Sequence, residues 1–141
     1  MSFHPYLAFA GNCRDAFTRY QEIFGGELVL LTAGDVPEDE NMEMPEGKED
    51  WVIHAALMAN DQLLMGSDDP SGAFDGQNRG MCCNVSVDEV AEARRIFDAL
   101  ADAGEVQMPL TETFFSPGFG MCMDRFGTPW MVVTNDPDAA M

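Results

Sequence analysis

The sequence is poor in the side chains that most metal and nucleic-acid sites use. It has two histidines and seven basic residues, of which Lys48 is the single lysine, against 25 aspartates and glutamates. The net charge of −18 repels a phosphate backbone, so we expect no nucleic-acid partner. The excess of acidic side chains is consistent either with a surface that keeps the protein in solution or with an electrostatic field that concentrates cationic ligands.

Cysteine pairs and long apolar runs are also missing. None of the four cysteines belongs to a CxxC pair, and the adjacent Cys82 and Cys83 would point to opposite faces of a strand. We therefore expect reduced, mostly buried thiols rather than a zinc knuckle or disulfides. No apolar run approaches the roughly 20 residues of a membrane helix, so a soluble, cytoplasmic protein without a membrane partner is expected.

A strand followed by a helix is predicted near the start of the chain. Pro5–Ala10 is a short apolar run, and apolar residues after Asn12 recur at helical spacing up to Gly25. Asn12 is the expected helix cap, and Asp15 would complete a capping box.

The same pattern recurs about halfway along the chain. Met81–Val87 predicts a strand, Asp88 is the expected cap of a second helix, and Gly104 ends that helix. A shift of 76 residues lays Asn12 on Asp88, so the two segments look like copies of one unit.

Three strand candidates follow each predicted helix. They are Leu28–Thr32, Trp51–Ala59 and Gln62–Ser67 in the first half, and Glu105–Thr111, Gly118–Asp124 and Pro129–Thr134 in the second. Tight turns are expected at Asn60-Asp61 and Phe126-Gly127. Each half therefore predicts β-α-β-β-β. The modules span about 3–68 and about 80–135 of one domain, 1–141.

Two segments lie outside the repeat. Gly34–Trp51 carries eight acidic residues and is expected to be an exposed loop, with a lid over a pocket as the alternative. Ser67–Gly80 is rich in glycine and aspartate and connects the two halves.

Several short motifs together resemble the PhnB-like branch of the vicinal oxygen chelate superfamily, which includes glyoxalase I, bleomycin-resistance proteins and extradiol dioxygenases. The motifs are YLAFAGNCRDAFTRYQEIFGGE at the front, IHAAL and LLMGSD in the middle, and DRFGTPW near the end. The resemblance implies an α+β fold in which two βαβββ modules form an eight-stranded open cup with helices on the outer face. It also implies a homodimer with a small-molecule ligand on the concave face.

Members of this branch often carry the name 3-demethylubiquinone methyltransferase. A typical S-adenosylmethionine site needs a glycine-rich turn from strand to helix in a doubly wound sheet. No segment of this sequence resembles such a turn, so methyl transfer is not expected.

The resemblance also implies where a metal would bind, on the first and last strands of each module. Pro5 and Met81 align with the first-strand places, and Met65 and Met131 with the last-strand places. Proline has no donor, and thioether sulfur is a soft ligand that suits Cu(I) rather than Fe, Mn, Ni or Zn. We therefore expect no metal and no other cofactor.

His54 is the most interesting polar residue of the predicted cup. It is open to three readings: a structural histidine, a polar contact or base for a ligand, or a displaced metal ligand. Strand alternation and, for Cys122, the alignment of the two modules add seven candidates for binding a ligand, most of them soft or apolar: Leu7, Phe9, Met65, Met81, Cys83, Cys122 and Met131.

Three functions remain open at this point. The leading hypothesis is a protein that binds a small hydrophobic or cationic molecule, for instance to sequester a drug or metabolite. The alternative is a metal-dependent lyase, isomerase or dioxygenase with a displaced site near His54. The third is a structural dimer whose cup is filled by its own side chains.

Overall fold

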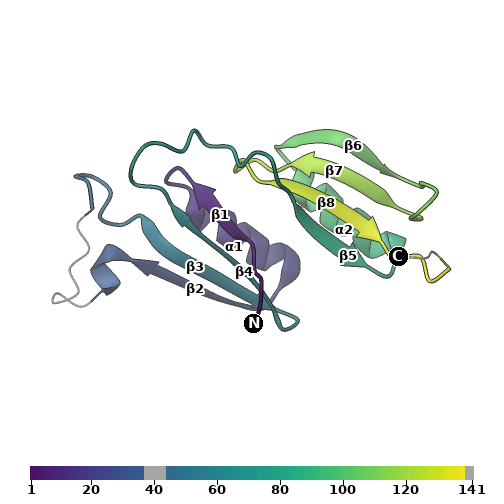
Figure 1. The fold of residues 1–141 in the computed structure, drawn as a ribbon, viewed down its shortest axis with the longest axis horizontal. Coiled ribbons are helices and arrows are strands. Elements are labelled where there is room, and N and C mark those ends of the chain that lie inside the picture. Colours follow the sequence, from purple (N-terminus) through teal and green to yellow (C-terminus); the bar gives the residue numbers. More distant parts are fainter. Residues whose placement is uncertain (37–43, 139–141) are drawn as a thin grey trace. The chain divides into compact units, whose positions relative to one another are not determined.

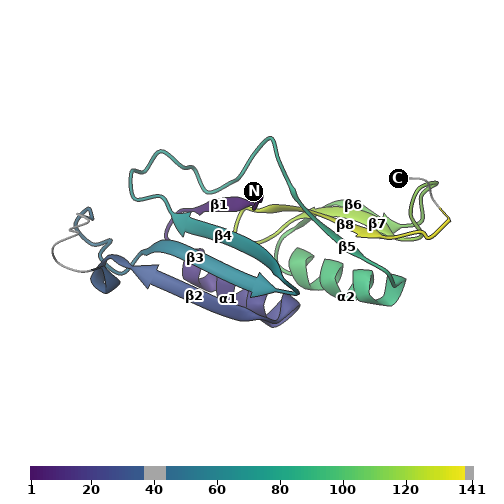
Figure 2. The ribbon, with the colours of Figure 1, turned by 60° about the horizontal axis from the view of Figure 1, so that its bottom comes forward.

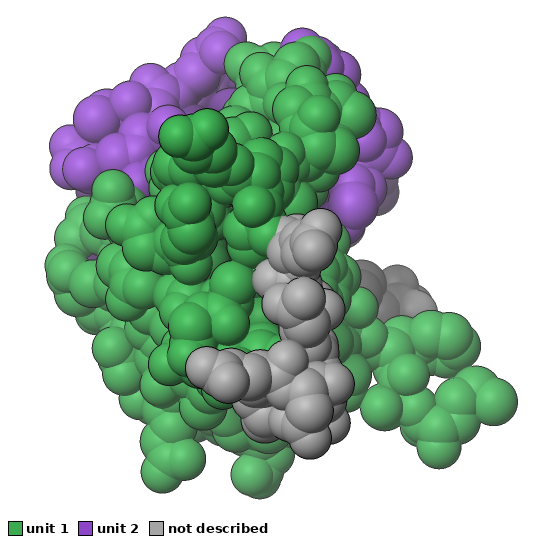
Figure 3. Space-filling model, turned by 90° about the vertical axis from the view of Figure 1, so that its left-hand side faces the viewer, with its two compact units in different colours: residues 1–77 green, residues 78–141 purple. Residues whose placement is uncertain are grey.

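The computed structural model describes residues 1–36 and 44–138. Its contacts divide the chain into two compact units, Met1–Gln77 and Asn78–Met141 (Figure 3). Within the described residues, each unit has one α-helix and one four-stranded sheet, and we call them unit 1 and unit 2.

The element order is β-α-β-β-β in both units, as predicted (Figure 1). Unit 1 comprises β1 (Tyr6–Phe9), α1 (Cys13–Phe24), β2 (Glu27–Thr32), the 3-10 turn η1 (Ala33–Asp35), β3 (Val52–Ala59) and β4 (Gln62–Asp68). Unit 2 comprises β5 (Cys83–Val87), α2 (Val90–Ala101), β6 (Glu105–Thr111), β7 (Phe119–Met123) and β8 (Pro129–Thr134).

The two sheets have the same topology. Their strand orders are β1-β4-β3-β2 and β5-β8-β7-β6, with the first strand parallel to the last and the other pairs antiparallel. These mixed sheets confirm an α+β fold built from two βαβββ modules.

Each helix covers one face of its own sheet (Figure 2). The helix α1 buries Cys13, Ala16, Phe17, Tyr20 and Ile23, and α2 buries Ala93, Ile96, Phe97 and Leu100. These residues recur every three or four positions, so a helix of either sequence presents one apolar stripe to the sheet.

The start of α1 corrects part of the cap prediction. Asn12 is the N-cap residue, but its side chain makes no capping hydrogen bond, so the capping box with Asp15 is wrong. The buried carboxylate of Asp68 instead accepts hydrogen bonds from the backbone N–H groups of Gly11 and Cys13, at 2.9 and 3.0 Å. A long-range contact thus replaces the local one.

The start of α2 differs from its prediction by one residue. The N-cap is Glu89, and no side chain caps the helix. Asp88 lies one position earlier, where its Oδ1 accepts a hydrogen bond from Asn135 Nδ2 at 3.0 Å.

The predicted turns are present. Asn60 and Asp61 join β3 to β4 with φ of 51° and 61°, as a tight hairpin turn requires. Between β7 and β8, Gly127 has φ of 90° and donates its N–H to the carbonyl of Asp124.

The acidic segment Gly34–Trp51 contributes η1 and a short turn before β3. Residues 37–43, on which the lid alternative depends, lie outside the described residues. In the part that is described, no helix is long and apolar enough to cross a membrane.

Candidate functional site

Each sheet has one face toward its own helix and one face away from it, which we call the helix-free face. In unit 1 a Cβ on Gly66 would lie 3.0 Å from the Phe17 ring of α1, so Gly66 faces the helix. Its paired neighbours Leu7 and Ala55 share that face, and both are fully buried. Residues one position away therefore point to the helix-free face.

One row of four residues crosses the helix-free face of unit 1. Tyr6 pairs with Met65, Met65 with Ala56, and Ala56 with Val29, so the row runs across β1, β4, β3 and β2. Tyr6 is 48% exposed and Val29 is 52% exposed. The row is apolar except for the tyrosine hydroxyl.

Tyr6 and His54 form the polar centre of this face. The Tyr6 hydroxyl and His54 Nδ1 lie 3.1 Å apart, and the two rings stack at 5.8 Å between centroids with 28° between their planes. Since β4 lies between β1 and β3, the two side chains meet above β4. His54 is half-buried.

A matching row crosses the helix-free face of unit 2. A Cβ on Gly120 would lie 2.8 Å from the Phe97 ring of α2, so residues one position from Gly120 point away from the helix. The register pairs Asn84 with Met131, Met131 with Met121, and Met121 with Met108.

The register shows which predicted ligand contacts lie on a helix-free face. His54, Met65 and Met131 do, and Met81 is exposed just before β5. Whether any of them binds a ligand stays a prediction. Tyr6, which strand alternation did not single out, lies beside His54; its place in the YLAF motif was the available signal.

Leu7 and Phe9 do not line a helix-free face, so their predicted direction is wrong. Both are buried between the sheet and α1, and the Phe9 ring meets the Phe17 ring edge-on at 5.9 Å. Because β1 is a short apolar run, the pattern did not show which of its faces meets the helix.

Cys83 and Cys122 also face the helix rather than the helix-free face. Both pair with Trp130, which is buried in the core of unit 2. Burial, with a smaller contribution from the Asp124 charge, raises the pKa of the Cys122 thiol to about 11. Burial likewise raises the pKa of Cys83 to about 11, with Cys82 and Asp124 adding to the effect. A raised pKa favours the protonated thiol over the nucleophilic thiolate, so neither cysteine is activated as a nucleophile.

The residues of the two rows do not fit the metal of the metal-dependent relatives. Pro5 and Met81 lie before β1 and β5, so the first-strand partners of Met65 and Met131 are Tyr6 and Asn84. A phenol, an amide and two thioethers are a poor donor set for Fe, Mn, Ni or Zn. Across residues 1–36 and 44–138, no three His, Cys, Asp or Glu side chains are grouped to hold a metal ion.

A polar hollow of about 230 Å³ lies near the start of α1. It is lined by Gly11, Arg14, Asp15, Asp50, Trp51, Val52 and Asp68. The Asp68 carboxylate at its base accepts three backbone N–H groups, including that of Val52 at 2.9 Å. This carboxylate is therefore committed to holding β3, β4 and the start of α1 together.

The DRFGTPW motif is also structural. Asp124 Oδ1 accepts hydrogen bonds from the N–H groups of Phe126 and Thr128, both at 2.9 Å, and Oδ2 accepts one from the Trp130 indole at 2.8 Å. The buried carboxylate thus fixes the turn from β7 to β8.

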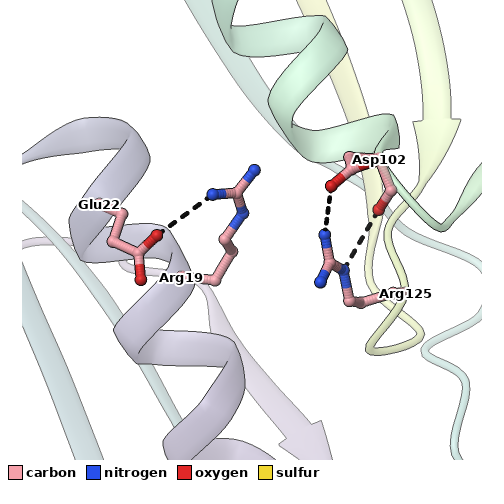
Figure 4. Close-up of polar contacts among 4 residues, drawn as sticks. All are labelled: Arg19, Glu22, Asp102 and Arg125. Carbon is pink, nitrogen blue, oxygen red and sulfur yellow. Dashed lines mark hydrogen bonds and ion pairs between the residues drawn. The ribbon is translucent and has the colours of Figure 1, made fainter.

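Arg125, in the same motif, binds a residue outside the turn. Its guanidinium binds Asp102 at the end of α2, with 2.7 Å between Nη2 and Oδ2, and its Nε donates to the Asp102 carbonyl (Figure 4). Figure 4 also shows Arg19 and Glu22, an exposed ion pair within α1.

Comparison with known proteins decides the family. The family model described as 3-demethylubiquinone-9 3-methyltransferase matches residues 1–133. The chain belongs to this family.

Protein YjdN of Escherichia coli K12 is 36% identical over an alignment of 140 residues, and the match covers 94% of each chain. Protein PA1353 of Pseudomonas aeruginosa has a crystal structure that is 41% identical over 96% of this chain and 98% of its own, with a TM-score of 0.86. A structure from Bacillus cereus is named "Putative 3-demethylubiquinone-9 3-methyltransferase, PhnB protein". It is 28% identical over 95% of this chain and 99% of its own, with a TM-score of 0.75.

A more distant structure shares the fold alone. It is a glyoxalase/bleomycin resistance protein/dioxygenase family enzyme from Burkholderia phytofirmans, 11% identical over 93% of this chain and 95% of its own, with a TM-score of 0.62. The chain therefore has the fold of the superfamily that the sequence motifs indicated, and a PhnB protein is among its structural relatives.

Proposed function

We propose that this protein binds a small, largely apolar molecule on the helix-free face of unit 1. The observation that carries the proposal is the Tyr6–His54 pair, a stacked and hydrogen-bonded polar contact on an otherwise apolar surface. Binding sites for small molecules are mostly apolar, with a few polar groups that fix the orientation of the ligand.

The surroundings of the pair suggest the chemistry of the ligand. Met65 is unbranched and polarisable, so it adapts to ligands of variable shape, and the two rings offer a flat surface for stacking. The net charge of −18 favours a ligand that also carries a positive charge. A planar, weakly cationic organic molecule fits these features best.

Methyl transfer, the reaction that the family name describes, is not part of this proposal. The turn from β1 to α1 contains a single glycine, Gly11, and a Cβ there would lie 2.8 Å from the Trp51 ring. This glycine therefore makes room for a tryptophan within the fold. A cofactor site of the usual kind would instead need a glycine-rich turn in a doubly wound sheet.

A thermal-shift screen against planar cationic and neutral compounds tests the proposal. Compounds that raise the melting temperature should lose at least tenfold in affinity when Tyr6→Phe or His54→Ala is introduced, as measured by calorimetry. The matched control is His4→Ala, because His4 is the other histidine and is exposed near the N-terminus.

Two outcomes would contradict the proposal. One is binding that is unchanged in both Tyr6→Phe and His54→Ala. The other is binding of S-adenosylmethionine together with methyl transfer to an acceptor. Homodimer formation stays a separate prediction, which sedimentation equilibrium of the full chain tests.

A further inference from the structure

The helix-free face of unit 2 carries three methionines side by side. Met131, Met121 and Met108 are paired in register on the adjacent strands β8, β7 and β6, with irregularities of β6 on both sides of Met108, and we call them the methionine row. Neighbouring strands are about 4.8 Å apart, and a methionine side chain is long and rotates about three bonds. The three sulfur atoms can therefore converge above Met121.

The equivalent row in unit 1 shows that this arrangement is not a requirement of the fold. At the places of Met121 and Met108, unit 1 has Ala56 and Val29, while Met65 matches Met131. Both units form the same sheet, so packing of the module does not require three thioethers.

The row is accessible at its outer end. Met108 is 43% exposed, and Met121 and Met131 are half-buried. Asn84, which is exposed, ends the row on β5. The row itself contains no carboxylate, imidazole or thiol.

We propose that the methionine row binds a soft monovalent metal ion, Cu(I) or Ag(I), through its three thioether sulfurs. Soft thioether ligands select such ions over the harder divalent metals. The acidic surface raises the local concentration of any cation. The inference is independent of the function proposed for unit 1.

Thioether binding has a signature that separates it from binding by cysteine or histidine. A thioether has no proton to lose, whereas thiolate and imidazole ligands must be deprotonated before they bind a metal. The affinity of the methionine row should therefore be constant between about pH 5.5 and pH 7.5. Affinity that rises about tenfold per pH unit would overturn the proposal.

The direct test is a titration of the full-length protein with silver nitrate in chloride-free buffer, observed by NMR of methionine labelled at the ε-methyl carbon. Of the eleven methionines, Met108, Met121 and Met131 should shift together and reach saturation at the same Ag(I) concentration. Shifts confined to other methionines, or no shift at all, would overturn the proposal.

Single substitutions identify which side chains bind the ion. Met108→Leu, Met121→Leu and Met131→Leu nearly conserve volume and are expected to fold, and each should weaken Ag(I) binding at least tenfold. The matched control is Met58→Leu, because Met58 has nearly the same exposure as Met108 and lies in unit 1. Loss of binding in Cys82→Ser, with binding retained in Met121→Leu, would assign the ion to the thiol and refute the row.

Discussion

At the scale of single residues, Asp124 holds together the last hairpin of unit 2. Its carboxylate accepts three hydrogen bonds within the DRFGTPW motif and is 5% exposed. Asp124→Ala would leave the Thr128 N–H and the Trp130 indole buried without this acceptor. We expect a loss of about 3 kcal/mol in the free energy of unfolding, measured by urea denaturation.

The neighbouring ion pair provides the control for this prediction. Arg125 and Asp102 are 37% and 65% exposed, and exposed pairs of this kind contribute at most about 1 kcal/mol. Arg125→Ala should therefore cost much less than Asp124→Ala. Equal losses in the two variants would contradict this prediction, because the buried acceptor would then contribute no more than the exposed ion pair.

The buried thiols of unit 2 make stability depend on alkaline pH. Burial raises the pKa of Cys83 and Cys122 to about 11, whereas an unfolded thiol titrates near 8.5. The stability that these two thiols contribute is fully present below the unfolded pKa. It is lost as pH rises toward 11, because the unfolded chain releases these protons at a lower pH than the folded chain does. Each thiol should lower the free energy of unfolding by up to about 1.4 kcal/mol per pH unit in that range.

Urea denaturation at pH 8, 9 and 10 measures this slope. Other groups also titrate at these pH values, so the decisive comparison is with the variants Cys83→Ala and Cys122→Ala, whose slopes should be shallower. The same slope in the wild type and in both variants would rule out the thiols as its cause.

At the scale of elements, a glycine stands directly before the strand that follows each helix. A Cβ on Gly26 would lie 2.1 Å from the carbonyl oxygen of Met58, and one on Gly104 would lie 2.3 Å from that of Met123. The oxygens belong to β3 and β7, which occupy equivalent places in the two sheets. Because glycine has no Cβ, the backbone at each of these two positions can lie directly against a neighbouring strand.

Gly26→Ala and Gly104→Ala should each lower the free energy of unfolding by about 2 kcal/mol or more, because backbone must move to admit the methyl group. Gly34→Ala is the control, since its nearest contact would be a side-chain oxygen at 3.7 Å. Chemical denaturation of the three variants measures the difference. A cost at Gly34 equal to that at Gly26 would contradict the role of close approach.

The sequence predicted the elements better than the direction of their side chains. Helices and hairpins follow from apolar spacing, glycines and turn residues, which are local signals. The capping contacts of α1 were mispredicted because Asp68 reaches this helix from a strand 55 residues further along the chain. The face of Phe9 was missed because β1 is apolar on both sides, so a shift of one residue reverses every side chain. β5 alternates between apolar and polar residues, and the face of Cys83 was missed because its apolar side was assigned to the ligand and not to the helix.

The same distinction applies to the candidate site. Met65, Met131 and His54 could be placed on their strands from the hairpins that flank them. Tyr6 could not be matched to His54, since the two lie 48 residues apart and meet across an intervening strand. Such a contact depends on the register of the parallel pair β1 and β4, which no local pattern encodes.

At the scale of the whole molecule, the dominant feature is the net charge of −18 on 141 residues. Like charges repel one another more strongly in the compact state than in the expanded unfolded chain. Salt shortens the screening length from about 30 Å at 0.01 M to about 8 Å at 0.15 M, which weakens this repulsion. Raising NaCl over this range should therefore increase the melting temperature by a few degrees, measured by calorimetry.

A variant with reduced charge separates repulsion from other effects of salt. Glu27, Glu105 and Glu112 are exposed, and changing all three to glutamine lowers the net charge from −18 to −15. The variant should melt higher than the wild type at 0.01 M NaCl, and its response to salt should be smaller. A melting temperature that falls with salt, or an equal response in both proteins, would show that self-repulsion does not limit the stability of this fold.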